Sequence, residues 1–238
     1  MFRSFLSGCS ELLTIPVCPR CRQPLPSREQ TKGLCLPCLE HLELTDIGLQ
    51  GTEPLPWWSL GAYDSAFRRE LLGLRKRPDP AVISALARSL GATLPGALCR
   101  DALVVAIPSW KRRANPLPEQ ICAGLPLPVA PLLRRRHATL GQHHLNRQLR
   151  ERNQAGSFCL SAEGERLAQQ GLRARDGLPA RGCLPERFLR KRQVLLVDDI
   201  LTTGATAQAA AMALEQGGFQ VAGLLCLART PARRRHAP

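Results

Sequence analysis

VLLVDDILTTGAT, residues 194–206, is the stretch that decides the fold of this 238-residue chain. Its first four residues are all apolar, as expected of a central parallel strand that is covered on both faces. Asp198 and Asp199 follow directly, and open α/β sheets place their ligands at the carboxyl ends of such strands. We therefore predict a buried strand that carries two carboxylates into one binding crevice.

The turn that follows the two acids is suited to a phosphate group. LTTGAT, residues 201–206, offers threonine hydroxyls, close backbone approach at Gly204 and free N–H groups at the start of a helix. Vicinal ribose hydroxyls are donors that match carboxylate acceptors. The stretch thus predicts a ribose 5-phosphate site. The stretch has neither the lysine nor the residue spacing of a P-loop, so the sequence does not support a P-loop. The alternative is an acidic strand end and a threonine cap that merely begin a helix.

The surrounding sequence predicts the α/β class. From residue 102 onward, short apolar runs alternate with helical patterns, as in a parallel sheet flanked by helices. Residues 161–192 mix charges, glycine and proline without strong periodicity, so we predict an insertion or surface excursion there. The other expected strands are 57–63, 102–108, 128–133 and 219–229, and the expected helices are 66–77, 81–94, 116–125 and 205–218.

Four cysteines near the start of the chain have the spacing of a metal site. They form C-x2-C-x13-C-x2-C, and they are Cys18, Cys21, Cys35 and Cys38. Two such knuckles bring four thiolates together on Zn²⁺, and a site closed by four cysteines leaves no position for a substrate. We predict a structural zinc module over residues 1–50 and a second domain over 51–238. The alternative is a chance pair of turns.

Composition and charge limit the kinds of partner and the cellular location that we expect. The net charge of +14 favours an anionic partner such as phosphate or nucleic acid, although a lineage bias toward arginine codons is the alternative. Aromatic residues make up 4% of the chain, which counts against an extended base-stacking surface. No stretch approaches eighteen apolar residues and the N-terminus is a poor secretory signal, so we expect no membrane span and a cytoplasmic location. The remaining cysteines are then expected to be mostly buried apolar groups.

VLLVDDILTTGAT resembles the phosphoribosyl pyrophosphate (PRPP) motif of type I phosphoribosyltransferases at all thirteen positions. Within that superfamily the chain resembles the ComF/GntX family, which is associated with natural competence and DNA uptake. The resemblance also covers the cysteine module, the basic run at 132–158 and the terminal LAR at 227–229. It implies a type I phosphoribosyltransferase-like parallel sheet flanked by helices, with a small N-terminal zinc module of four cysteines.

The resemblance also implies roles for particular residues. Asp198 and Asp199 would face the ribose hydroxyls of PRPP. IPSWKRR, residues 107–113, stands where the superfamily has its pyrophosphate loop, with Mg²⁺ on the phosphate oxygens. Family members usually continue into R-G-F-N-Q, whereas this chain reads RRANPLPEQ. The 5-phosphate would be wrapped by Thr202, Thr203, Gly204, Ala205 and Thr206, and the diphosphate would be met by Lys111, Arg112 and Arg113.

Two functions stay open at this point. One is a ComF-like protein that binds PRPP or a related ribose phosphate in DNA uptake, with single-stranded DNA and a DNA-uptake translocase as implied partners. The other is an active phosphoribosyltransferase in salvage, whose acceptor and catalytic residues the sequence does not identify. For the segment at 134–152 three interpretations stay open, of which the first is slightly favoured: a loop that closes over PRPP, a nucleic-acid footprint or a solvated face.

Overall fold

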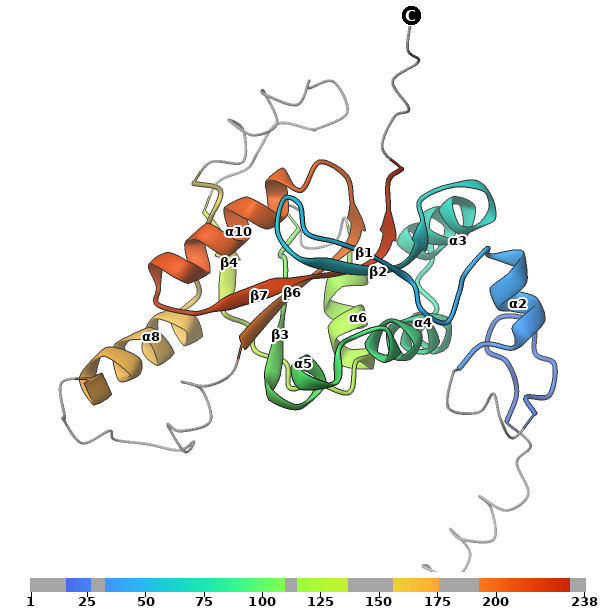
Figure 1. The fold of residues 1–238 in the computed structure, drawn as a ribbon, viewed down its shortest axis with the longest axis horizontal. Helices are drawn as coiled ribbons and strands as arrows, with labels where there is room; N and C mark the ends of the chain where they lie inside the picture. Colours follow the sequence, from blue (N-terminus) through green and yellow to red (C-terminus); the bar gives the residue numbers. More distant parts are fainter. Residues whose placement is uncertain (1–15, 27–32, 110–114, 137–155, 176–192, 232–238) are drawn as a thin grey trace, which may run out of the picture.

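A computed structural model describes residues 16–26, 33–109, 115–136, 156–175 and 193–231. It confirms the α/β class with a mostly parallel central sheet (Figure 1). In this sheet the edge pair β1 and β2 is antiparallel, and the other neighbours pair in parallel. In order across the sheet, the strands are β1 (Leu49–Gly51), β2 (Trp57–Ala62), β7 (Val221–Arg229), β6 (Gln193–Leu201) and β3 (Ala102–Ala106).

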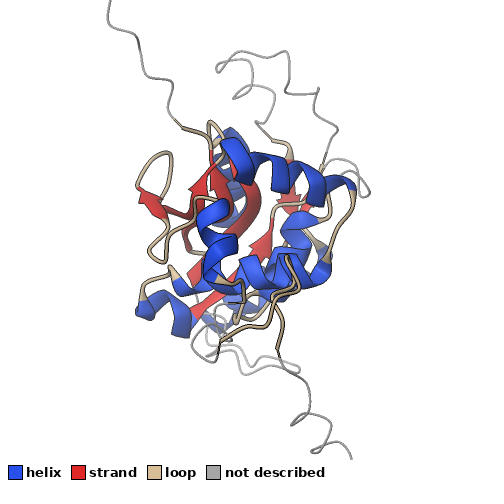
Figure 2. Ribbon diagram, turned by 90° about the vertical axis from the view of Figure 1, so that its right-hand side faces the viewer, coloured by secondary structure: helices blue, strands red, loops and turns tan. Residues whose placement is uncertain are grey.

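Helices cover both faces of this sheet because the side chains of its strands alternate. In β6, Leu195 and Val197 pack with α4 and α6, whereas Val194 and Leu196 pack with α10. Figure 2, seen from the end that carries α2, α3 and α4, shows these helices in front of the strands. The described helices are α2 (Leu36–His41), α3 (Ser65–Lys76), α4 (Pro80–Ala92), α5 (Gly96–Asp101), α6 (Leu117–Gly124), α8 (Ala162–Arg175) and α10 (Ala205–Gln216).

Aspartate caps fix where two of these helices begin. Asp64 accepts from the backbone N–H of Ser65, at 2.7 Å, at the start of α3. Asp79 accepts from two backbone N–H groups at the start of α4, where Pro80 occupies the first turn. With its start fixed, α3 carries Arg75 in its last turn toward the central strand.

The structure differs from the sequence expectation in its third quarter. Within the supposed excursion at 161–192, residues 162–175 form the regular helix α8, and its Leu167 joins a buried cluster. Helix α8 contacts β5 (Phe158–Leu160), which pairs with β4 (Leu133–Arg135) in a separate two-stranded sheet. Val129, placed in a strand by the sequence, makes a single parallel bridge to Val104. Residues 137–155 and 176–192 lie outside the described part.

The cysteine-rich module packs onto the main core. Its leucines, including Leu34, Leu39 and Leu42, belong to the same buried cluster as Phe67 of α3 and Leu86 of α4. The division after residue 50 stays a prediction, and β1, which spans that point, pairs with β2. In the described part of the chain, no helix is long and apolar enough to cross a membrane.

Candidate functional site

The two acids of the central strand lie close to its carboxyl end. Strand β6 continues for two residues beyond them, to Leu201, so both carboxylates stem from extended backbone. Because successive strand side chains alternate, Asp199 lies on the face of α3 and α6 and Asp198 on the face of α10. The two acids are neighbours in the sequence, but their side chains lie in different surroundings in the structure.

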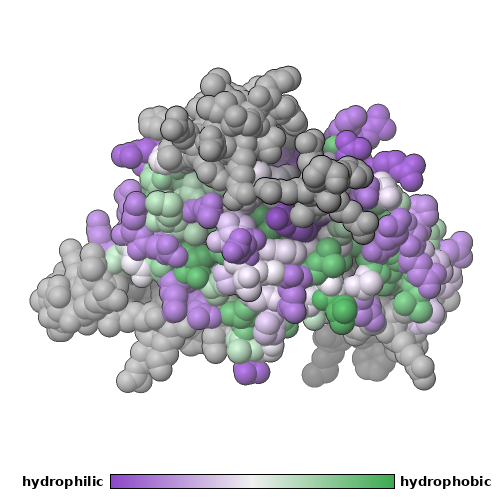
Figure 3. All heavy atoms as spheres, turned by 45° about the horizontal axis from the view of Figure 1, so that its top comes forward, coloured by the Kyte–Doolittle hydropathy of each residue, from purple (hydrophilic) through white to green (hydrophobic). Residues whose placement is uncertain are grey.

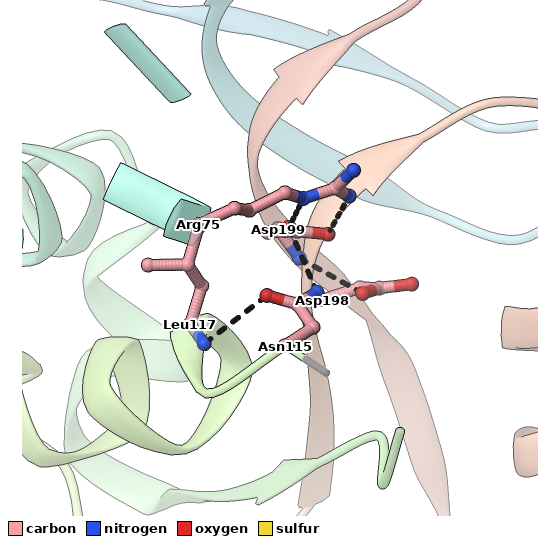
Figure 4. Close-up of polar contacts among 5 residues, drawn as sticks. All are labelled: Arg75, Asn115, Leu117, Asp198 and Asp199. Atoms are coloured by element: carbon pink, nitrogen blue, oxygen red, sulfur yellow. Dashed lines mark hydrogen bonds and ion pairs between the residues drawn. The ribbon is translucent and has the colours of Figure 1, made fainter. Parts of the chain in front are cut away.

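Asp199 is buried and fully engaged. Its side chain is 3% exposed, and both oxygens accept from Arg75 of α3, at 2.6 and 2.9 Å. Asn115, just before α6, donates to the same carboxylate at 2.9 Å and accepts from the backbone N–H of Leu117 (Figure 4). Burial alone would lower the pKa of Arg75, but the hydrogen bonds and charge of Asp199 raise it above its usual value. A bidentate charged pair is therefore built into the floor of the site.

Asp198 has a less complete set of partners. Its carboxylate accepts from the backbone N–H of Asp199, at 2.9 Å. Burial and the adjacent Asp199 charge raise the pKa of Asp198 well above its usual range. The charge of Arg75 opposes this rise. A second nearby cation is Arg135 of β4, which donates to the Pro108 carbonyl at 2.9 Å and lies over the Phe158 ring. Burial lowers the pKa of Arg135, and the charge of Asp198 opposes that effect.

The threonine–glycine turn leads from these acids into α10. Gly204 has φ +81° and precedes the first helical residue, Ala205. That backbone favours glycine, and a Cβ there would also clash with Pro54 of the β1–β2 connection. The Thr203 hydroxyl accepts from the Ala205 N–H at 3.4 Å. The turn therefore lies at a helix N-terminus, the part of a helix that binds anions.

Arg229 supports this turn from the neighbouring strand β7. Its guanidinium donates to the backbone carbonyls of Leu201 and Thr202 and lies over the Trp57 ring, 5.5 Å from the centroid. The indole N–H of Trp57 in turn donates to the Glu53 carbonyl at 3.0 Å. The arginine of the terminal LAR is thereby placed beside the motif that it follows in the sequence.

The structure brings the expected acids and turn together and adds residues that sequence reasoning missed. Arg75, Asn115 and Arg135 come from three separate segments. In sequence, Arg75 and Asn115 were indistinguishable from ordinary polar surface residues, whereas Arg135 lies in the segment at 134–152, for which a loop over PRPP was one interpretation. The expected pyrophosphate-contact residues Lys111, Arg112 and Arg113 lie outside the described part. What remains is a strand-end site with acceptors, two flanking guanidinium groups and a helix N-terminus, which suits a ligand with hydroxyls and phosphate.

The four cysteines converge as their spacing predicts. Their Sγ atoms all lie within 4.8 Å of one another, and the Sγ atoms of Cys18 and Cys38 are 3.8 Å apart. A tetrahedral zinc with Zn–S bonds of about 2.3 Å separates its sulfurs by roughly 3.8 Å. Cys35 caps α2 and Cys38 lies in its first turn, so this helix fixes the second knuckle. The cluster can therefore bind a metal such as zinc.

The first knuckle is also tied to the main core. Arg20 donates to the Sγ of Cys38, at 3.6 Å, and to Glu70 of α3, at 3.1 Å. Burial alone would raise the pKa of Cys18, but backbone hydrogen bonds, that from Cys35 first, lower it to about 6. Burial raises the pKa of Cys35 to about 12. One thiolate is thus favoured in the cluster before any metal binds.

The cysteines outside the cluster were expected to be mostly buried, and this holds for only some of them. Cys122 and Cys226 are fully buried, whereas Cys99 is exposed and Cys159 is half-buried. Burial raises the pKa of Cys122 to about 12 and that of Cys226 further above its usual value. Cys9 and Cys183 lie outside the described part.

Comparison with known proteins gives distant relatives. No family model matches the chain. It is 27% identical, over an alignment of 235 residues, to the DNA utilization protein YhgH of Salmonella typhimurium strain LT2. The same figures hold for the DNA utilization protein YhgH of Salmonella typhi. In each case the alignment covers 91% of this chain and 85% of the relative.

Proposed function

We propose that this protein binds PRPP or a related ribose phosphate at the end of β6 and acts in DNA handling. The observation that supports the proposal best is the continuous path from Asp198 and Asp199 into the left-handed turn at Gly204 and the start of α10. Hydroxyl acceptors and a phosphate-binding helix end are placed in succession on rigid elements. The link to DNA rests on the distant similarity to DNA utilization proteins.

The surroundings of Asp198 and Asp199 suggest different roles for the two acids in ligand binding. Asp199 accepts hydrogen bonds from Arg75 and Asn115, so it holds these two side chains in the floor of the site. Asp198, whose pKa is raised, can meet a ribose hydroxyl either as an acceptor or through a retained proton. The 5-phosphate would lie on Thr202, Thr203, Gly204, Ala205 and Thr206, and the diphosphate, with Mg²⁺, on Lys111, Arg112 and Arg113.

We propose that the cysteine cluster holds a structural zinc ion. All four ligands come from the protein, so the metal would stabilise the module and its contact with α3 rather than bind substrate. We further propose a reducing, cytoplasmic setting, with single-stranded DNA and a DNA-uptake translocase as partners. If the protein transfers the ribosyl group of PRPP to an acceptor and releases pyrophosphate, the same site is that of a phosphoribosyltransferase.

Calorimetric titration of the zinc-loaded protein with PRPP and Mg²⁺ tests the proposal. We expect saturable binding that the double variant Asp198→Asn, Asp199→Asn loses. Glu215→Gln, an exposed acid at the far end of α10, is the matched control and should bind as wild type does. Absence of binding by wild type, or equal binding by the double variant, would overturn the proposal. Pyrophosphate release measured after candidate nucleophilic acceptors are added separates an enzyme, which moves the ribosyl group from pyrophosphate to the acceptor, from a binding protein.

A further inference from the structure

We infer that a groove between the cysteine module and α3 binds the phosphate backbone of a nucleic-acid strand. The groove has a volume of about 600 Å³. Arg20 and His41 of the module form one wall. The other wall includes Arg69 and Gly73 of α3 and Arg77, the residue that directly follows this helix. It lies away from the β6 site, on the opposite side of α3 from the Asp199 pocket. Hydrophilic residues gather at this end of the molecule (Figure 3).

The groove carries positive charge that the described protein does not neutralise. Its acid, Glu70, is paired with Arg20 at 3.1 Å, and both side chains are about one-fifth exposed. Arg69 and Arg77 are exposed, and neither has an ion-pair partner among the residues that the structure describes. Two guanidinium groups that no described carboxylate occupies are therefore available to an anion in solution.

Gly73 gives a second, independent indication of a ligand. It lies in the interior of α3, where glycine is less stable than alanine. A Cβ added there would meet no described atom within 4 Å, so no packing inside this part of the protein requires a glycine. The open space above it is the groove. A glycine floor between two arginines allows a ligand's backbone to come close to the helix.

The spacing of the charges indicates a repeating anion. Arg69 and Arg77 are eight residues apart, so their Cα atoms are separated by about 12 Å along the helix. Charge spread along an open groove fits several successive phosphates better than one phosphate ion. Among the described residues that line the groove, none is Phe, Tyr or Trp and the one aromatic ring is that of His41, so contact with the phosphates is favoured over stacking of successive bases. The choice of nucleic acid over other polyanions rests on the proposed role in DNA handling.

Fluorescence anisotropy with a labelled oligothymidine and the metal-loaded full chain tests this site. We expect the double variant Arg69→Ala, Arg77→Ala to bind at least tenfold more weakly. Its salt dependence should be shallower, by roughly 1 in log–log slope for each phosphate that the variant no longer neutralises. The control Arg88→Ala, Arg100→Ala removes two exposed arginines from α4 and α5 and should change binding much less. Equal losses in the two double variants would reduce the effect to overall charge and overturn the site.

Two further variants separate the groove from the β6 site and from a folding defect. Gly73→Ala should keep or raise Tm while it weakens oligonucleotide binding, and unchanged binding would contradict close approach at this position. Asp198→Asn, Asp199→Asn should bind the oligonucleotide as wild type does even if PRPP binding is lost. The reverse pattern, with DNA binding lost only in the acid variant, would place the strand at β6. Binding of a duplex of the same sequence shows whether the groove accepts one strand or both. Weaker binding of either the single strand or the duplex by the Arg69→Ala, Arg77→Ala variant supports the groove as the site.

Discussion

The cysteine cluster and the acidic site at β6 are built in opposite ways. The four thiols come from a short stretch, two knuckles that local turns and α2 bring together. The carboxylate of Asp199 instead meets Arg75 and Asn115, which are 124 and 84 residues away along the chain. A site made of a short stretch can depend for its stability on its ligand, whereas a site made of distant segments depends on the whole fold. The two should therefore respond differently to the same kinds of damage.

Metal removal should have the largest effect, and it should be confined to the cysteine end. Binding to structural zinc sites amounts to about 10 kcal/mol or more, and few apolar residues lie between the knuckles. We expect strong chelation to expose residues 16–26 and 33–42 to proteases while β6 and α10 stay protected. Proteolysis mapped by mass spectrometry measures this.

Two serine variants provide the matched comparison. Cys38→Ser should imitate chelation, and Cys99→Ser, at an exposed cysteine outside the cluster, should not. If the module resists proteases after verified loss of the metal, its stability comes from packing against α3 and α4 instead.

Loss of Arg75 should have the next largest effect, and it should reach across the whole fold. Removing one partner of a buried ion pair costs about 3–5 kcal/mol. Because the Arg75 side chain is 33% exposed, solvent screening favours the low end for Arg75→Ala. Urea unfolding measures the change. Arg75→Met with Asp199→Asn should recover much of the loss, since no unpaired charge then remains. A cost equal to that of Arg100→Ala would show that the pair contributes little.

Asp199→Asn tests ligand binding at the partner of Arg75, and it is expected to lower stability as well because it leaves that arginine without a charged partner. An amide cannot replace the charged hydrogen bonds of the carboxylate, and such bonds contribute roughly 1.5–3 kcal/mol each. We expect PRPP affinity to fall about tenfold to a hundredfold in a calorimetric titration. Glu215→Gln is the control with the same change in charge. An unchanged dissociation constant would remove Asp199 from the site.

The same contrast explains how far the sequence could predict this molecule. The cluster of Cys18 to Cys38 was predictable because its spacing already fixes its geometry. Strand β6 and the turn at Gly204 were predictable because an apolar run, two acids and a glycine are local patterns. Arg75 was not, because in sequence it is one of several basic residues on α3 and only the tertiary fold turns it toward Asp199.

Helix α8 was missed for a related reason. Its sequence is rich in charged and polar residues, and its one described buried apolar side chain, Leu167, gives almost no periodic signal. Its start combines a local cap with a tertiary contact: Ser161 accepts from the Gly164 N–H at 3.0 Å and donates to the Pro131 carbonyl, 30 residues away, at 2.5 Å. Segments that depend on distant partners in this way are the ones that local patterns describe least well.

The smallest expected effect is a dependence of stability on pH that comes from Asp198. It would show that Arg135 and Arg75 do not fully offset the charge of this acid. Burial and the Asp199 charge raise its pKa in the folded state, so the folded protein holds this proton more tightly than the unfolded chain. The stability that this proton contributes is complete below the unfolded pKa, near 4, and is lost as pH rises through the folded pKa. Asp198→Asn cannot ionise, so the variant should gain stability relative to wild type as pH rises. Urea unfolding at several values from about pH 4 to about pH 8 measures that difference. A difference that stays the same at every pH would mean that Arg135 and Arg75 offset the charge of Asp198 completely, so that its pKa is the same in the folded and unfolded protein.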